Sequence, residues 1–328
     1  MTANQFAVVQ NSHGAFGPAS ASSTLTINQS TDTFYNGYIR DNTGNDPFTL
    51  AISKSGAGTL TLDGSPYGNG AITYSGGTFI NGGTIALNSG GQKGTLPDSG
   101  AIIVDTGGTL RANAIDALRY LNHNAGNGIF VNVGGVVTVG IGSRVSMDRD
   151  LSVTGGTITS VGAGDGSGAS YSLRDTNGSV MTFTSSAGGT PATFSAQGLG
   201  LNGTATFNVT NGPGAVDLNV TGTLKDNFIA GSLVKDGAGT MVISTTSTYT
   251  GATTVNAGTL VFRASQTLSS LTIADGAEVV FGDGLSFAAA PGKFGGPALV
   301  PEPGTLGLLL LGALGFAARR RRDGAMIS

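Results

Sequence analysis

Residues 235–262 read KDGAGTMVISTTSTYTGATTVNAGTLVF, and their pattern predicts the fold of most of the chain. Turns rich in glycine alternate in it with short runs whose apolar residues occupy every second position, which is typical of β-strands that bury one face. A second copy, KSGAGTLTLDGSPYGNGAITYSGGTFINGGTIAL, occupies residues 54–87. Extra residues around Ser65 to Gly70 separate its two halves, and they predict a loop that bulges without moving the strands.

Shorter pieces of the same pattern recur between the two copies. Each places a glycine pair before a strand-like run: Gly107-Gly108, Gly134-Gly135 and Gly155-Gly156. Glycine supplies the positive φ that a tight turn needs, so each pair predicts a turn followed by a strand. Such self-similarity predicts stacked coils with inward rows of Leu, Ile and Val and with outward Thr and Ser facing water.

The two copies resemble the autotransporter-associated β-strand repeat, whose pattern runs roughly Lys-x-Gly-x-Gly-Thr-Leu, Tyr-Thr-Gly-x-Thr, Asn-x-Gly-Thr-Leu. Residues 54–87 match less well because of the insertion. The resemblance implies an all-β, right-handed parallel β-helix (β-solenoid) displayed outside the cell, and the alternative is an antiparallel sandwich or Greek-key stack. The better copy carries the repeat motif at Gly237, Gly239, Thr240, Tyr249, Gly251, Asn256, Gly258 and Thr259.

A different kind of segment begins at Val300. Pro301, Glu302 and Pro303 precede an apolar run over residues 304–318, and four arginines follow it: Arg319, Arg320, Arg321 and Arg322. A helix over this run would be about 22 Å long, which is shorter than the roughly 30 Å hydrocarbon core of a bilayer. Arginine snorkelling and local thinning would cover the difference. The arginines favour a cytoplasmic stop over a short helix buried in a globular core, because four of them are hard to bury.

These residues resemble the PEP-CTERM sorting signal of Gram-negative exosortase systems, with the triplet, the Leu-rich span and the arginine cluster in the same order. The resemblance implies export, transient anchoring in the inner membrane through the C-terminal helix, and processing near the triplet by an exosortase. Glu302 is one of only two glutamates in the chain, the other being Glu278. Residues 1–10 lack the positive and apolar regions of a signal peptide, so we expect a truncated or misplaced start.

The expected organisation has five parts. Residues 1–50 form an N-terminal β capping region, residues 51–287 the β-solenoid repeat domain, residues 288–299 a flexible linker, residues 300–322 the sorting signal and residues 323–328 a tail. One stretch, residues 110–124, breaks the β pattern. Its apolar residues have near-helical spacing, which predicts a short helix or an irregular excursion from one coil.

The composition excludes several classes of protein. The 328 residues include 56 glycines, no cysteine and only 11% charged residues. Disorder is opposed by 39% hydrophobic residues, and collagen by the absence of a three-residue glycine period. Disulfides and thiolate metal sites are excluded without cysteine. A net charge of −3 without a basic patch argues against nucleic-acid binding.

Candidate chemistry is sparse, so we predict no enzyme activity, no cofactor and no metal. His13 and His123 have no metal-ligand neighbours at close spacing. Asp148-Arg149-Asp150, with Arg144 nearby, is the densest charged cluster, and a solvated turn is favoured over a catalytic dyad. Residues 162–166 have the composition of a calcium-binding nonapeptide repeat, but they occur once, which favours a plain loop.

The sequence therefore predicts an exported structural or adhesive protein of the cell surface or extracellular matrix. Its expected partners are an exosortase, the membrane, and exopolysaccharide or other surface glycans bound by a wall of Thr, Ser and Asn in many weak contacts. The alternative is a polysaccharide-active enzyme of the lyase or hydrolase type on the same solenoid, and a third possibility is a passive matrix component.

Overall fold

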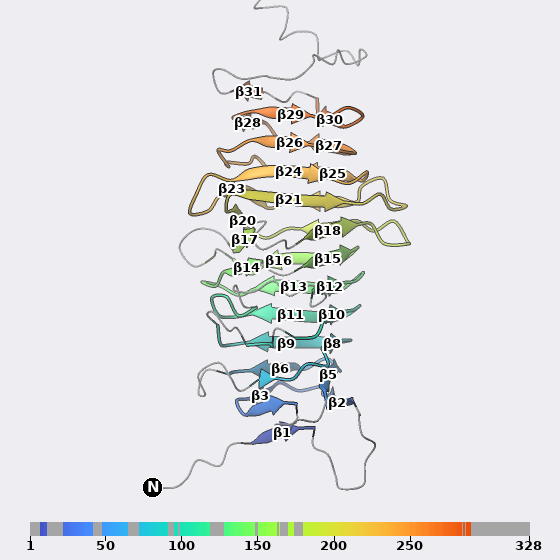
Figure 1. Cartoon of the computed structure of the whole chain (residues 1–328), viewed down its shortest axis with the longest axis vertical. Helices are drawn as coiled ribbons and strands as arrows, with labels where there is room; N and C mark the ends of the chain where they lie inside the picture. Colours follow the sequence, from blue (N-terminus) through green and yellow to red (C-terminus); the bar gives the residue numbers. More distant parts are fainter. Residues whose placement is uncertain are drawn as a thin grey trace, which may run out of the picture. The chain divides into compact units, whose positions relative to one another are not determined.

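The computed structural model describes residues 7–11, 22–41, 48–64, 72–90, 95–97, 99–118, 128–147, 150–162, 164, 170–173, 180–283, 285 and 287–289. Within these residues the chain forms strands and no helix. Figure 1 shows the strands stacked one above another in sequence order, from β1 to β31.

Two long sheets of eleven strands run along the stack. The first long sheet contains β2 (Ser23–Asn28), β5 (Leu50–Ser55), β8 (Thr78–Ile80), β10 (Ile102–Val104), β12 (Ile129–Val131), β15 (Leu151–Thr154), β18 (Met181–Thr184), β21 (Thr204–Val209), β24 (Ser232–Asp236), β26 (Thr253–Val255) and β29 (Leu271–Ile273). The second long sheet contains β3 (Thr33–Tyr35), β6 (Thr59–Leu62), β9 (Gly83–Leu87), β11 (Gly108–Ala112), β13 (Val136–Val139), β16 (Thr157–Ser160), β19 (Ala192–Phe194), β22 (Leu218–Val220), β25 (Thr240–Ile243), β27 (Thr259–Phe262) and β30 (Glu278–Phe281).

Three shorter sheets complete the coils at different heights. They are β1 (Val8–Gln10), β4 (Tyr38–Arg40) and β7 (Ile72–Thr73); β14 (Val145–Met147), β17 (Tyr171–Leu173), β20 (Gly198–Leu201) and β23 (Thr223–Asp226); and β28 (Gln266–Leu268) with β31 (Phe287–Ala289). Strand β31 thus reaches two residues into the stretch expected to be a linker, and residues 290–299 lie outside the described part of the chain.

All pairings between these strands are parallel. Parallel neighbours need a long connection, and here each connection in the first long sheet passes through a strand of the second long sheet before it returns one level further along. The prediction of a parallel β-solenoid is therefore confirmed, and the antiparallel sandwich or Greek-key alternative is wrong. The right-handed sense of the coil and the capping role of residues 1–50 stay predictions.

The core consists of inward rows of apolar side chains, as the alternation predicted. In the second long sheet one buried row, in register from strand to strand, contains Leu60, Ile85, Leu110, Val137, Ile158, Phe194, Val220, Ile243 and Phe262. Phe281 of β30 continues the register but is exposed. The first glycine of each predicted pair, Gly107, Gly134 and Gly155, has a positive φ of 80°, 74° and 63°. Those three turns are confirmed.

Residues 110–118 do not form the helix that their near-helical apolar spacing predicted. Leu110 lies in strand β11, fully buried between Ile85 and Val137 of the neighbouring coils. Residues 114–118 then form an irregular turn, in which Asp116 has a φ of 55°. The spacing arises because a strand and a turn each contribute apolar residues, and this result agrees with the second alternative, an irregular excursion. Residues 119–127 lie outside the described residues.

Candidate functional site

Each repeat copy contains a fully buried lysine whose amine is bound by three main-chain carbonyls. In β24 the Nζ of Lys235 donates to the carbonyl oxygens of Asp236 at 3.1 Å, Gly237 at 2.7 Å and Ala257 at 2.8 Å. Burial lowers the pKa of Lys235 to about 8, so the amine still holds three protons for three acceptors at neutral pH. Because Ala257 follows β26, the ammonium joins the corners of two successive coils.

Lys54 makes the same arrangement in the other copy. Its Nζ donates to the carbonyl oxygens of Ser55 at 2.8 Å, Gly56 at 3.0 Å and Gly82 at 3.3 Å. Burial lowers the pKa of this lysine as well. We call each lysine with its three carbonyls a lysine lock. The two locks explain why the repeat places Lys two residues before the first glycine of its Gly-x-Gly segment.

The tyrosine of each copy is also buried and pairs with a threonine of the same copy. Tyr249 and Thr253 share a hydrogen bond of 2.6 Å between their hydroxyls, and Tyr74 and Thr78 share one of the same length. The Tyr-x-x-x-Thr spacing therefore satisfies a buried hydroxyl inside one coil, where an unpaired hydroxyl would be costly.

Most other residues of the predicted motif bring main chains of successive coils together. The amide of Thr259 donates to the carbonyl of Gly239 at 3.2 Å, that of Gly251 to Gly231 at 2.8 Å, and that of Asn256 to Lys235 at 2.9 Å. These motif residues thus build the stack.

Gly258 provides a direct test of this packing. Its φ is +66°, and a Cβ there would lie 2.5 Å from the carbonyl oxygen of Gly239. We expect Gly258→Ala to lower the free energy of unfolding by about 3 kcal/mol, because strain and backbone displacement add. Gly276 has a similar φ of +79° with nothing within 4 Å, so Gly276→Ala should cost only about 1 kcal/mol. Denaturant unfolding of both variants measures the difference, and equal losses would contradict the close packing at Gly258.

Aspartates bind main-chain amides of adjacent coils, a role that the sequence did not suggest. Asp217 is fully buried and accepts hydrogen bonds from Ser185 Oγ at 2.7 Å, Gly212 N at 2.8 Å and Thr240 N at 3.0 Å. Burial raises its pKa, but these hydrogen bonds outweigh burial and hold the pKa below the usual range. The carboxylate therefore stays ionised at neutral pH.

Two pairs of aspartates lie at matching places before the two copies. Asp32 accepts from Thr59 N at 2.7 Å, as Asp217 does from Thr240 N. Asp41 accepts from Ser75 N at 3.2 Å, and Asp226 accepts from Thr250 N at 2.9 Å. Asp41 and Asp226 are each followed by an asparagine upstream of a repeat, and this shared Asp-Asn pair is the sequence signal that could have identified them.

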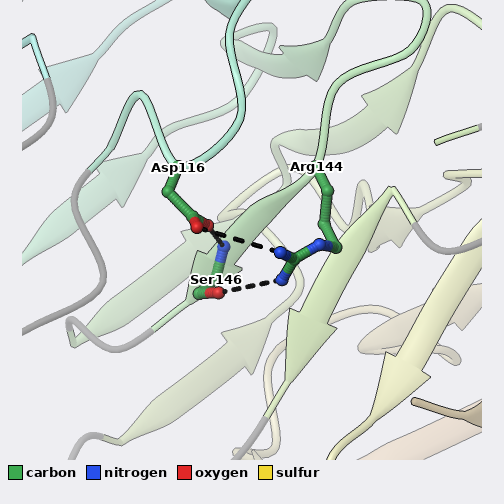
Figure 2. A network of polar contacts seen from close by, with 3 residues as sticks. All are labelled: Asp116, Arg144 and Ser146. Atoms are coloured by element: carbon green, nitrogen blue, oxygen red, sulfur yellow. Dashed lines mark hydrogen bonds and ion pairs between the residues drawn. The ribbon is translucent and has the colours of Figure 1, made fainter. Parts of the chain in front are cut away.

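Another aspartate, Asp116, lies at the edge strand β14 of the four-stranded sheet (Figure 2). Its Oδ1 accepts from the amide of Ser146 at 3.0 Å, and its Oδ2 lies 3.9 Å from Nη2 of Arg144. Arg144 Nη1 in turn lies 3.4 Å from Ser146 Oγ, and the guanidinium lies 5.1 Å from the centre of the Phe228 ring. The carboxylate thus takes the place of a neighbouring strand at this edge.

The charged cluster expected around Arg144 is therefore only partly described. Asp148 and Arg149 lie outside the described residues, as do His13 and His123. Asp150 accepts from the amide of Val180 at 3.0 Å. Over the residues that the structure describes, no group of three or more His, Cys, Asp or Glu could hold a metal ion.

The outward side of the second long sheet carries a row of hydroxyls. Its members are in register on consecutive strands and partly exposed: Thr59, Thr84, Thr109, Thr157 and Thr193, with Val136 between the third and the fourth. The expected orientation, with Thr outward and Leu or Ile inward, is confirmed for β6, β9, β11 and β16, and Val136 of β13 is an outward exception.

The predicted sorting residues, Val300 to Pro303 and Arg319 to Arg322, lie outside the described residues. A search of the described residues for a helix long and apolar enough to cross a membrane finds none.

Comparison with known families finds matches for the two repeat copies and for the C-terminal segment. The family model described as passenger-associated-transport-repeat matches residues 52–87 and 233–262, and the PEP-CTERM protein-sorting motif matches residues 299–322. No curated protein and no solved structure matches the chain.

The fold and these matches together define the class of protein. The chain is an exported surface β-solenoid protein with passenger-associated-transport repeats in its body and a PEP-CTERM sorting motif after it.

Proposed function

We propose that this solenoid is a structural and adhesive component of the cell surface or extracellular matrix of a Gram-negative cell. An exosortase recognises residues 300–303, processes the chain after transient anchoring in the inner membrane, and so places it at the surface. The observation that carries the proposal is the sorting motif joined to a body in which buried polar side chains such as Asp217 and Lys235 bind the main chain of the stack.

The outward hydroxyl row supports an adhesive role. Hydroxyls repeated on successive coils offer many weak hydrogen bonds to a polymer that has hydroxyls of its own, and many weak contacts along one polymer add up to high avidity. Six carboxylates that a glycan-cleaving enzyme could have used instead bind main-chain amides: Asp32, Asp41, Asp116, Asp150, Asp217 and Asp226. This arrangement supports a structural role over the lyase or hydrolase alternative.

The proposal is tested in cells. Protease added to intact cells should remove the chain, and a strain that lacks it should adhere less to a surface coated with the exopolysaccharide of that strain. Complementation with the wild-type chain should restore adhesion. Protection of the chain from external protease, or release of reducing sugar from the exopolysaccharide by the purified chain, would contradict the proposal.

A further inference from the structure

The outward side of the first long sheet changes character over three neighbouring strands. One outward row runs in register through Thr26, Ser53, Phe79, Ile103, Phe130, Ser152 and Thr182. The row continues to Asn208 and Asp236, so three apolar side chains stand together in a row that is otherwise polar. Phe79 and Ile103 are partly exposed and Phe130 is 38% exposed, so the three side chains form an apolar column that water reaches.

The two phenylalanine rings lean back over glycines. A Cβ at Gly128 would lie 3.4 Å from Cε2 of Phe130, and one at Gly77 would lie 3.6 Å from Cε2 of Phe79. Gly77 and Gly128 directly precede β8 and β12, and each stands two residues before its phenylalanine. One edge of each ring therefore lies close to the main chain at these glycines, where a larger side chain would contact it.

A polar column runs beside the apolar one. Directly after the ends of β8, β10 and β12 come Asn81, Asp105 and Asn132. Their main-chain amides continue the ladder by donating to the carbonyls of Lys54, Ile80 and Val104. Asn132 Nδ2 donates to Asp105 Oδ1 at 2.6 Å, and Asn81 Nδ2 donates to Ser53 Oγ at 3.1 Å. These contacts hold the amides and the carboxylate in place while leaving further donor and acceptor positions.

We propose that these two columns form a binding strip for a neutral, extended β-linked hexopyranose chain that runs along the stack axis. The proposal rests on the adhesive function above and assigns it a site. Aromatic faces suit the C–H faces of pyranose rings, and amides and carboxylates suit vicinal hydroxyls. Parallel strands repeat every ~4.8 Å, close to the length that one hexopyranose adds to an extended chain, so each coil would meet one sugar.

The charge and the area of the strip favour a neutral glycan chain over an anionic polysaccharide or a protein partner. Among the six side chains of the strip the only charge is the carboxylate of Asp105, which disfavours an anionic polysaccharide. A stable protein interface buries about 800 Å² on each partner. Three partly exposed apolar side chains on adjacent strands make a patch much smaller than that, whereas a single glycan chain needs only a narrow strip.

The test measures binding of the full-length chain to hydroxyethyl cellulose by affinity electrophoresis and to cellohexaose by calorimetry, with polygalacturonate as the anionic comparison. We expect the wild type to bind both neutral probes. The double variant Phe79→Ala with Phe130→Ala should weaken the Kd about tenfold or more, because it removes both ring contacts. Phe79→Tyr with Phe130→Tyr should keep binding, and Ser152→Phe, which lengthens the apolar column, should strengthen it.

The matched control is Phe34→Ala, because Phe34 is 58% exposed on β3 of the second long sheet, away from the strip. It should bind like the wild type, and circular dichroism should show unchanged strand content in all variants.

If the wild type binds and the double alanine variant binds equally well, the strip is overturned but the adhesive function is not. Binding of polygalacturonate alone, or of no probe, would overturn the strip, while the surface assay in cells still decides the proposed function. Self-association that the double variant abolishes would make this face an interface between copies and would also overturn the strip.

Discussion

Replacing Lys235 by methionine should lower the free energy of unfolding by about 3 kcal/mol, because three main-chain carbonyls lose a charged donor. Methionine has a similar length and no donor, so the chain keeps its packing volume while the carbonyls of Asp236, Gly237 and Ala257 lose their contact with Nζ. Removal of a buried charge recovers some desolvation energy, but acceptors left without their partner outweigh it.

The lysine lock also predicts which coils lose stability in Lys235→Met. In a stack of coils each coil contacts mainly its neighbours, so a broken lock should destabilise the coils that it joins. Amide hydrogen exchange should therefore accelerate in β24 to β27 of Lys235→Met. In Lys54→Met, the matched variant in the other copy, it should accelerate in β5, β6, β8 and β9 instead.

The control for loss of a positive charge is Arg263→Met, since Arg263 is exposed and follows β27. It should change the free energy of unfolding by less than about 0.5 kcal/mol. If Lys235→Met behaved like this control, the three carbonyls would have other adequate partners and the lock would not stabilise the stack.

The sequence predicted the elements that depend on local pattern. Alternating residues such as Thr59-Leu60-Thr61-Leu62 indicated strands with one buried face, and glycine pairs indicated the turns before them. Strands and turns depend on residues close together in the sequence, so they can be identified without knowing which coils are in contact. The parallel stack followed from the repeat itself, because identical units of this kind bury their apolar face on one another.

What the sequence left open depends on register between coils. The acceptor Ala257 O lies in the coil after Lys235, and the amide of Thr240 lies in the coil after Asp217, so neither pair is visible along the chain. The column of Phe79, Ile103 and Phe130 has the same origin, because its members stand 24 and 27 residues apart and meet only once the strands are in register. Leu110 misled the helix prediction because apolar spacing alone does not separate a strand and turn from a helix.

Replacing Pro301, Glu302 and Pro303 by alanines should abolish maturation of the exported chain. In our proposal an exosortase recognises this triplet, and the two prolines keep it extended and separate from the apolar run. Alanines would let a helix continue upstream from Gly304, which removes both the recognised side chains and their extended backbone. The unprocessed chain should then accumulate in the membrane fraction, and the form released to the surface should fall below detection in immunoblots of a host that carries an exosortase.

Glu302→Ala and Glu278→Ala form a matched pair, because these are the two glutamates of the chain. Glu278 is exposed in β30, where its Oε2 accepts from Thr259 Oγ1 at 3.3 Å, so its replacement should leave processing unchanged.

Replacing Arg319 to Arg322 by glutamines should act at a different step, since it removes the positive charges that stop transfer and leaves the triplet unchanged. The chain should then lose its membrane-anchored intermediate. Normal processing and surface release of the triple-alanine variant would contradict the proposal that an exosortase recognises residues 300–303.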